Sequence, residues 1–239
     1  ENGSVTGNIL GAALPMLVAQ VLSLLYNIVD RIYIARIPHV GTTALGAVGL
    51  CFPIVVIITA FSNLFGSGGA PLFSIKRGMG DSERARTIMN TSFSMLCVSA
   101  FFIMTLGMVF AKPLLVIFGA SEIALKYAYP YMMIYLIGTL PSMISTGMNP
   151  FINAQGYATT GMLSVAVGAI SNLILDPIFI FVFDMGIKGA AIATVISQIF
   201  SALFVLYFLE KKAELKVRFL KRNEFRNSID YAKNIVSLG

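Results

Sequence analysis

Two long stretches of the sequence carry no charged side chain, and they constrain the fold more than any other feature. Residues 40–75 and 127–175 contain no Asp, Glu, Lys or Arg. A helix needs about 20 apolar residues to cross roughly 30 Å of hydrocarbon, so the first stretch holds one membrane span and the second holds two. The chain is 57% hydrophobic and only 12% charged, whereas an average soluble domain is about 25% charged. The sequence therefore predicts an integral membrane protein.

The apolar residues occur in runs that are long enough for membrane helices. A transmembrane β-barrel would show short alternating segments instead. Short segments rich in Gly, Pro and polar residues separate the runs, as expected for turns. We predict an all-α integral membrane protein, a bundle of six transmembrane helices, with spans over residues 9–34, 44–65, 88–111, 128–151, 162–183 and 189–209.

The chain changes character after the sixth span. Residues 1–209 form the predicted membrane region, whereas residues 210–239 contain eight Lys or Arg and four Asp or Glu. We predict that residues 210–239 are a basic cytoplasmic linker with amphipathic stretches, leading to a seventh helix that the sequence does not include. Solvation beside the membrane surface explains this charge without a nucleic-acid partner, and recognition of anionic lipid is the alternative.

The distribution of basic residues predicts the orientation. Loops facing the cytoplasm carry an excess of Lys and Arg. The side that holds the N-terminus, the second and fourth loops and the tail carries twelve basic residues, and the other side carries five. Both termini are therefore predicted to be cytoplasmic.

Two carboxylates inside the predicted spans, Asp30 and Asp176, need an explanation. Placing a charged side chain at the centre of a membrane costs about 2.5–3.5 kcal/mol on insertion scales, so such residues are candidates for function. From a rise of about 1.5 Å per residue, Asp176 and Thr194 are expected at the same depth. Asn172 precedes Asp176 by four residues and shares its helix face. Tyr131 enters the same half of the membrane from the fourth span, and Asn27 lies nearly one turn before Asp30.

This set of side chains suits two kinds of coupling chemistry. A carboxyl group in a medium of low dielectric constant holds a proton more readily than in water, and can therefore take up and release one. Alternatively, the oxygens of Asp30, Asn172, Asp176 and Thr194 could bind a hard cation such as Na⁺. The structural alternative is that Asp30 pairs with Arg31 or reaches the membrane interface.

Enzyme chemistry has no visible basis in the sequence. It contains no Gly-x-x-x-x-Gly-Lys-Ser/Thr loop for nucleotides, no His, Cys and carboxylate cluster for a metal cofactor, and no Ser, His and Asp set. The one histidine, His39, lies in a predicted loop. Both cysteines, Cys51 and Cys97, lie inside predicted spans and are expected to be buried free thiols. We therefore expect a protein that is not an enzyme and that has no cofactor.

Several spaced motifs resemble those of multidrug and toxic compound extrusion (MATE) transporters. Pro15 with residues 27–34 (NIVDRIYI) resembles the first helix of that family, and residues 68–85 (GGAPLFSIKRGMGDSERA) resemble its loop between helices two and three. Residues 152–162 (INAQGYATTGM) resemble the connection between helices four and five. Residues 172–180 (NLILDPIFI) and 189–194 (GAAIAT) resemble helices five and six. The resemblance covers essentially the whole chain.

The resemblance implies the N-terminal six-helix lobe of a twelve-helix transporter in a bacterial plasma membrane. Such a transporter would export small organic compounds, often cationic and apolar, driven by entry of H⁺ or Na⁺, with a C-terminal lobe as partner. The polar cluster of the family's N-terminal lobe would correspond to the residues selected above. Arg31, and the lack of a basic residue in 153–156, depart from the family pattern. A related flippase for lipid-linked saccharides, or a self-associating six-helix channel or scaffold, are the alternatives.

Overall fold

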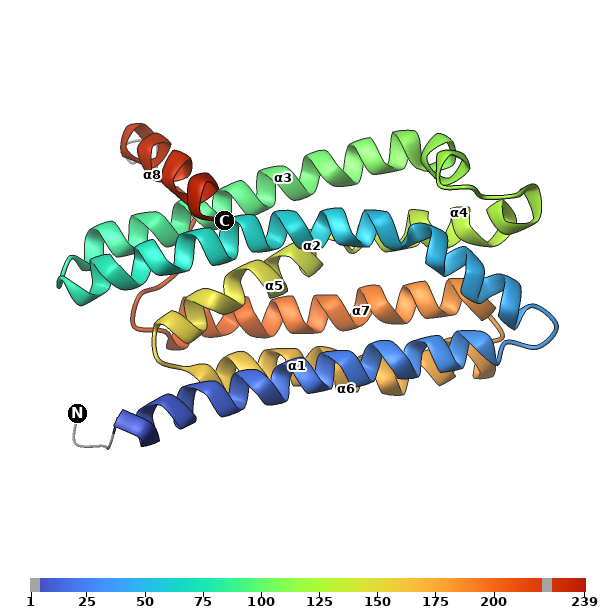
Figure 1. Ribbon diagram of the computed structural model, residues 1–239, viewed down its shortest axis with the longest axis horizontal. Coiled ribbons are helices and arrows are strands. Elements are labelled where there is room, and N and C mark those ends of the chain that lie inside the picture. The colour runs from blue at the N-terminus through green and yellow to red at the C-terminus, as the bar shows by residue number, and fades with distance from the viewer. Residues whose placement is uncertain (1–4, 221–224) are drawn as a thin grey trace.

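The computed structural model describes residues 5–220 and 225–239, and these residues form helices and no strands. Most helices run along one long axis and form an elongated bundle (Figure 1). The elements are α1 (Val5–Ala35), α2 (Gly41–Gly78), α3 (Ser82–Ile117), α4 (Glu122–Ile137), α5 (Thr139–Ala154), α6 (Ala158–Pro177), η1 (Ile178–Val182), α7 (Gly186–Tyr207), η2 (Phe208–Lys212) and α8 (Phe225–Leu238).

The chain crosses the bundle six times before α8. Five helical segments of the described residues are each long and apolar enough to span a membrane: α1, α2, α3, α6 with η1, and α7 with η2. The remaining crossing consists of α4 and α5, which have 16 residues each and are separated by Gly138. Each is shorter than the roughly 20 residues of a span, so the two cross end to end. The predicted all-α membrane bundle is confirmed.

The fourth crossing differs from the continuous span predicted over 128–151, because the helix is interrupted at Gly138. Pro141 has no N–H group and cannot bond to the carbonyl of Ile137, which breaks the hydrogen-bond ladder there. Gly138 also faces α7 closely. A Cβ atom at this position would lie 2.6 Å from Gln198 Oε1 and 2.9 Å from Val195 Cγ2. The break therefore coincides with a close contact between the fourth and sixth crossings.

The helices extend beyond the spans predicted from hydrophobicity. α2 has 38 residues and α3 has 36, which correspond to about 57 and 54 Å of helix. This length exceeds the roughly 30 Å of a hydrocarbon core, so their polar ends project from it. We call the end of the bundle near residues 76–86, 154–161 and 210–220 the basic end. The opposite end holds the connections 36–40, 118–121 and 183–185.

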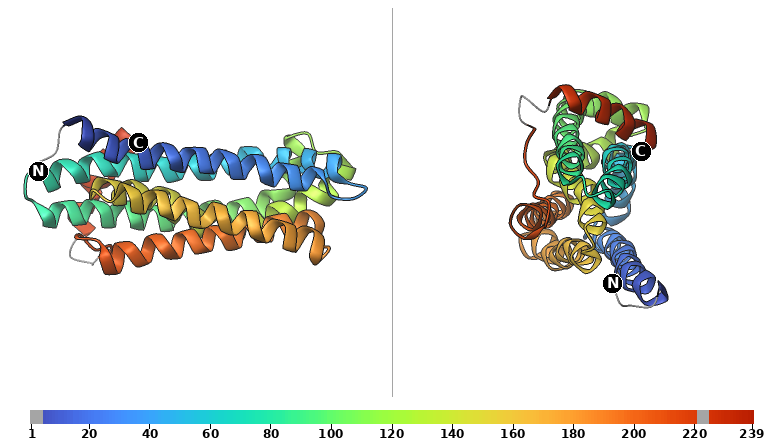
Figure 2. Two further views of the ribbon diagram at one scale, coloured as in Figure 1. Left: turned by 90° about the horizontal axis from the view of Figure 1, so that it is seen from below. Right: turned by 90° about the vertical axis from the view of Figure 1, so that its left-hand side faces the viewer.

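α5 lies in the middle of the bundle, and α1 lies at its edge. α5 packs against α2, α3, α6 and α7, whereas α1 packs chiefly against α6. The end-on view in Figure 2 shows α1 projecting from one corner. The helix that carries Asp30 is therefore held mainly by the helix that carries Asp176.

α2 and α5 cross with their backbones in contact. A Cβ atom on Gly66 would lie 2.5 Å from the carbonyl oxygen of Gly147 and 3.0 Å from its Cα atom. A Cβ atom on Gly147 would in turn lie 2.7 Å from a methyl group of Leu96 on α3. Small residues allow such close packing between membrane helices, and this contact fixes α5 against α2 and α3.

Residues 213–220 form a non-helical segment at the basic end, which we call the strap. The buried Gln155 side chain holds it by two hydrogen bonds: its Nε2 donates to the Leu215 carbonyl at 3.3 Å, and its Oε1 accepts from the Leu215 N–H at 2.9 Å. Asn90 Oδ1 accepts from the Arg218 N–H at 2.9 Å. The strap is thereby fixed to α3 and to the α5–α6 connection.

α8 lies across the bundle near the basic end rather than along it (Figures 1 and 2). It packs on α2 and α3, with Ile235 and Ser228 buried in the contact. The structure thus contains a helix where the sequence predicts amphipathic stretches. Lys221 and Arg222, which also belong to the predicted linker, lie outside the described residues, and the division of the chain at residue 209 stays a prediction.

Candidate functional site

Asn172, Asp176 and Thr194 form a buried polar contact between α6 and α7. Asn172 Nδ2 donates to Asp176 Oδ1 at 3.1 Å and lies 3.5 Å from Thr194 Oγ1. The side chains are almost fully enclosed, with Asp176 0% exposed. The four-residue spacing on α6 aligns the amide with the carboxyl group, and the antiparallel return of α7 brings Thr194 to the same depth.

α1 presents Asp30 to the same place. The carboxyl groups of Asp30 and Asp176 lie within hydrogen-bonding reach of each other. Asp30 Oδ1 and Asp176 Oδ2 are buried, and neither accepts a hydrogen bond from a donor in the described residues. Two ionised carboxylates this close would repel each other strongly in a low-dielectric interior. The geometry therefore suits a proton or a cation held between the two groups.

Three tyrosines surround the carboxyl pair. The rings of Tyr131 and Tyr135 stack with centroids 6.1 Å apart and an interplanar angle of 14°. Tyr26, Tyr131 and Tyr135 each lie near enough to Asp30 for its charge to act on them. The hydroxyl group of Tyr135 contacts the side chain of Gln198 on α7. Four crossings, formed by α1, α4, α6 and α7, thus contribute polar groups to one site.

Sequence reasoning missed Tyr26, Tyr135 and Gln198. Each lies four residues from a residue that was identified: Tyr26 from Asp30, Tyr135 from Tyr131, and Gln198 from Thr194. Residues four apart share a helix face. Applying this spacing to every candidate, and not to Asp176 alone, would have found all three.

Two other residues lie beside Asp30 on α1. Asn27 is exposed, its Nδ2 donates to the backbone carbonyl of Ser23 at 2.7 Å, and its side chain also contacts Tyr26, so it lies at the edge of the cluster. The guanidinium carbon of Arg31 lies 6.0 Å from the ring centroid of Phe52, a geometry that favours a cation–π interaction. Arg31 forms no ion pair with Asp30.

A second polar network lies nearer the basic end. Asn149 Nδ2 donates to the Gly161 carbonyl at 2.9 Å and to Ser164 Oγ at 2.7 Å, and Asn153 Nδ2 donates to Asn149 Oδ1 at 3.1 Å. Ser201 Oγ donates to the Ser164 carbonyl at 2.8 Å. These bonds connect α5, α6 and α7 and hold this half of the bundle together.

The described residues contain no group of three or more His, Cys, Asp or Glu side chains that could hold a metal ion. The Na⁺ site considered from the sequence would need oxygens of Asn172 and Thr194 besides the two carboxyl groups. In the structure, the Asn172 nitrogen faces Asp176 and Thr194. Asp30, Asp176 and Thr194 therefore offer oxygens directly, and Asn172 would do so only after its amide rotated.

Comparison with known proteins identifies the fold and the family. The MatE family model matches residues 15–178, well over half of the chain. The chain belongs to the MatE family. This match includes Asp30, Tyr131, Asn172 and Asp176, so most of the carboxyl site lies within the matched region, and the resemblance to MATE transporters seen in the sequence is confirmed.

Curated relatives of this MatE chain are transporters. A multidrug export protein MepA from Staphylococcus haemolyticus is 28% identical over 214 residues, which are 90% of this chain and 47% of that protein. An FAD transporter from Shewanella oneidensis is 28% identical over 221 residues, 91% of this chain and 47% of the relative. The chain thus spans about half the length of the curated relatives it matches.

Solved structures agree with this family assignment. A MOP superfamily transporter from Pyrococcus furiosus, described as having a binding pocket of reverse polarity that suggests a different function, has a TM-score of 0.88 and 27% identity. The match covers 99% of this chain and 51% of that one. A multidrug resistance MATE transporter in an outward-facing conformation has a TM-score of 0.84 and 26% identity, covering 99% and 53%. This chain therefore has the architecture of one half of a MATE transporter.

Proposed function

We propose that this chain is the N-terminal half of an ion-coupled exporter of small organic compounds in a bacterial plasma membrane. One observation carries the proposal: Asp30 and Asp176 meet inside the membrane, and Arg31, whose charge acts on Asp30, forms no ion pair with either carboxyl group among the described residues. Carboxyl groups inside a membrane are energetically unfavourable, and those that occur there commonly mark ion pathways or proton relays. The excess of Lys and Arg supports a cytoplasmic location for the basic end and both termini.

The pair would couple transport by controlling the fit between α1 and α6. With a shared proton, the two carboxyl groups form a hydrogen bond and the helices can approach. When the proton leaves, two negative charges face each other and repel in a low-dielectric medium. Because α1 packs chiefly against α6 and much less against the other crossings, this repulsion acts on a helix that little else restrains.

The geometry favours H⁺ over Na⁺ as the coupling ion. The Asn172 amide donates to Asp176, as it would to a carboxyl group that shares a proton with its neighbour. A sodium ion needs oxygen ligands and would require this amide to rotate. No cofactor besides the coupling ion is needed, because binding and release of the ion at the carboxyl pair use only protein side chains.

Export would require a second six-helix lobe. Alternating access in secondary transporters involves movement of one repeat against another around a site near the midplane. The curated relatives are about twice as long as this chain, which supports a C-terminal partner lobe. Polar groups gathered at one depth also favour this function over a channel, whose pore would need them along its length.

The relatives suggest two candidate substrate classes. MepA is a multidrug export protein, which supports organic, often cationic and apolar, compounds. The other relative is an FAD transporter, and an anionic substrate would be compatible with the exposed guanidinium of Arg31 beside the site. A lipid-linked saccharide would similarly require basic residues around the cavity, and Arg31 is the candidate in this lobe.

Replacing Asp176 by Asn tests the proposal directly. Asp176→Asn retains the size and the hydrogen-bonding capacity of the side chain but cannot exchange a proton. In the longer protein, reconstituted in vesicles, we expect export driven by a pH gradient to be lost, while the protein stays folded. Asp184→Asn is the matched control, because Asp184 lies exposed in the turn between η1 and α7 and should retain export.

Two results would contradict the proposal. Wild-type export by Asp176→Asn would show that the carboxyl group is structural. Export driven by a Na⁺ gradient with no response to a pH gradient would refute the preference for H⁺. A separate measurement on this chain alone should show no gradient-driven export, and activity equal to that of the longer protein would refute the need for a second lobe.

A further inference from the structure

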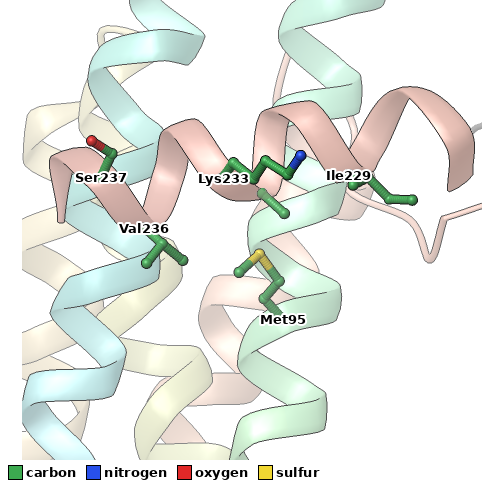
Figure 3. A pocket seen from close by; sticks show the side chains of 6 residues that line it. Met95, Ile229, Lys233, Val236 and Ser237 are labelled. Carbon is green, nitrogen blue, oxygen red and sulfur yellow. The ribbon is translucent and has the colours of Figure 1, made fainter.

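α3 and α8 line an open, shallow apolar groove that is separate from the carboxyl site. It has a volume of about 540 Å³ and is lined by Met95, Ile229, Ala232, Lys233, Val236 and Ser237. Figure 3 shows Met95 of α3 and Val236 of α8 near each other, with Lys233 and Ser237 on the same helix as Val236. The groove is open along its length, unlike the enclosed clefts that bury most of a small molecule.

The apolar side of α8 is wider than its contact with the bundle. Ile235 is fully buried against α2 and α3, whereas Ile229 and Val236 remain 46% and 47% exposed. On α3, the neighbouring Val98 is 56% exposed and faces outward from the bundle. The uncovered strip of α8 therefore continues the surface by which α3 meets the acyl chains of the membrane.

The groove lies on the apolar part of α3, beyond its last charged residue at the basic end. Arg86 is the last charged residue of α3 before an uncharged stretch that ends at Lys112. Met95 is nine residues beyond Arg86, or about 13 Å along the helix. Interfacial helices place their apolar faces roughly 5–10 Å into the boundary between headgroups and acyl chains. Met95 lies somewhat deeper than this, so the apolar face of α8 would meet acyl chains, and a long side chain would be needed to reach the headgroups.

The charge at the groove selects the kind of lipid. Lys233 is exposed at its rim and forms no ion pair with a described residue. A lysine at this depth can extend its ammonium group to the phosphate level while its alkyl chain stays on apolar surface. Residues 210–239 as a whole carry eight basic and four acidic side chains, and this excess attracts anionic headgroups.

We propose that the groove between α3 and α8 binds an anionic phospholipid of the leaflet at the basic end. One acyl chain lies against Met95, Ile229 and Val236, and the phosphate contacts the Lys233 ammonium group. The lipid fills the space between α8 and α3 and fixes α8 to the bundle. This binding does not depend on the proposed export function.

Lipid binding by the purified protein tests this proposal. Native mass spectrometry would measure the affinity for phosphatidylglycerol and for phosphatidylcholine. We expect wild-type protein to prefer phosphatidylglycerol by about fivefold, the effect of one basic residue at an anionic surface. Lys233→Gln should abolish the preference. Lys212→Gln, which removes the same charge from η2 outside the groove, should retain it.

Two further measurements separate the acyl-chain contact from binding of the headgroup. Val236→Ser should weaken binding of both lipids, because it removes apolar surface from the groove. Inorganic phosphate should not compete at concentrations comparable to the lipid. The proposal is wrong if Lys233→Gln keeps the preference, if Val236→Ser binds both lipids like the wild type, or if inorganic phosphate competes as well as phosphatidylglycerol.

Discussion

The contact between α2 and α5 predicts that one added methyl group will have opposite effects at two glycines of the same helix. Gly66→Ala would place a Cβ atom 2.5 Å from the carbonyl oxygen of Gly147. The obstructing atoms belong to the backbone of α5 and cannot rotate away, so the helices must separate. Gly49→Ala, also on α2, meets no atom within 4 Å and serves as the matched control.

The expected magnitudes follow from these contacts. Overpacking a close contact costs about 1–3 kcal/mol, and replacing Gly by Ala in a helix gains about 1 kcal/mol. We therefore expect Gly66→Ala to lower the free energy of unfolding by up to about 2 kcal/mol, towards the upper end because the obstructing atoms are backbone atoms. Gly49→Ala should raise it by up to about 1 kcal/mol, because only the helix preference changes.

The protein's own thiols allow the measurement. The sequence has two cysteines and no tryptophan, and both Cys51 and Cys97 are free and at least partly buried. A thiol-reactive fluorescent dye would report their exposure during heating in detergent. For a chain of this size, 1 kcal/mol corresponds to about 2–4 °C, so Gly66→Ala should lower the midpoint by up to about 8 °C. Equal shifts of the same sign in both variants would refute the packing argument.

Three further variants test the break, the strap and the carboxyl pair. Gly138→Ala should lower the unfolding midpoint less than Gly66→Ala, because the atoms it meets within 3 Å, in Gln198 and Val195, are side-chain ends that can move. Gln155→Ala leaves the Leu215 N–H unpaired, which costs about 1–3 kcal/mol. Hydrogen exchange at this amide should accelerate roughly five- to a hundredfold. Unchanged exchange would contradict the conclusion that Gln155 holds the strap. Asp30→Asn should keep the fold and abolish pH-driven export in vesicles, whereas retained export would leave Asp176 as the sole coupling group.

The sequence predicted the crossings because membrane insertion depends on local composition. Every backbone group in hydrocarbon must be paired within its own helix, so an uncharged run of sufficient length specifies a span without knowledge of its neighbours. The shared depth of Asp176 and Thr194 followed from residue counting alone. Their contact through Asn172 shows that the rise per residue and the order of crossings were enough.

Features that depend on contacts between distant residues were missed. The break at Gly138 needs both Pro141 and the approach of α7, and a continuous apolar run contains no sign of that approach. The hydrogen bonds from Gln155 to Leu215 join residues 60 positions apart. The exposure of Asn27 depends on which sector of α1 faces α6, and the hydrophobic pattern of a helix that lies partly in lipid does not specify this.

The break at Gly138 also has an electrostatic consequence. A helix carries a partial positive charge at its N-terminus and a partial negative charge at its C-terminus, each about half an elementary charge. α4 and α5 run in the same direction and are separated by one residue, so the negative end of α4 meets the positive end of α5. The two partial charges largely cancel. The fourth crossing therefore bends near the carboxyl site without adding a field of its own, and the negative potential there comes from Asp30 and Asp176.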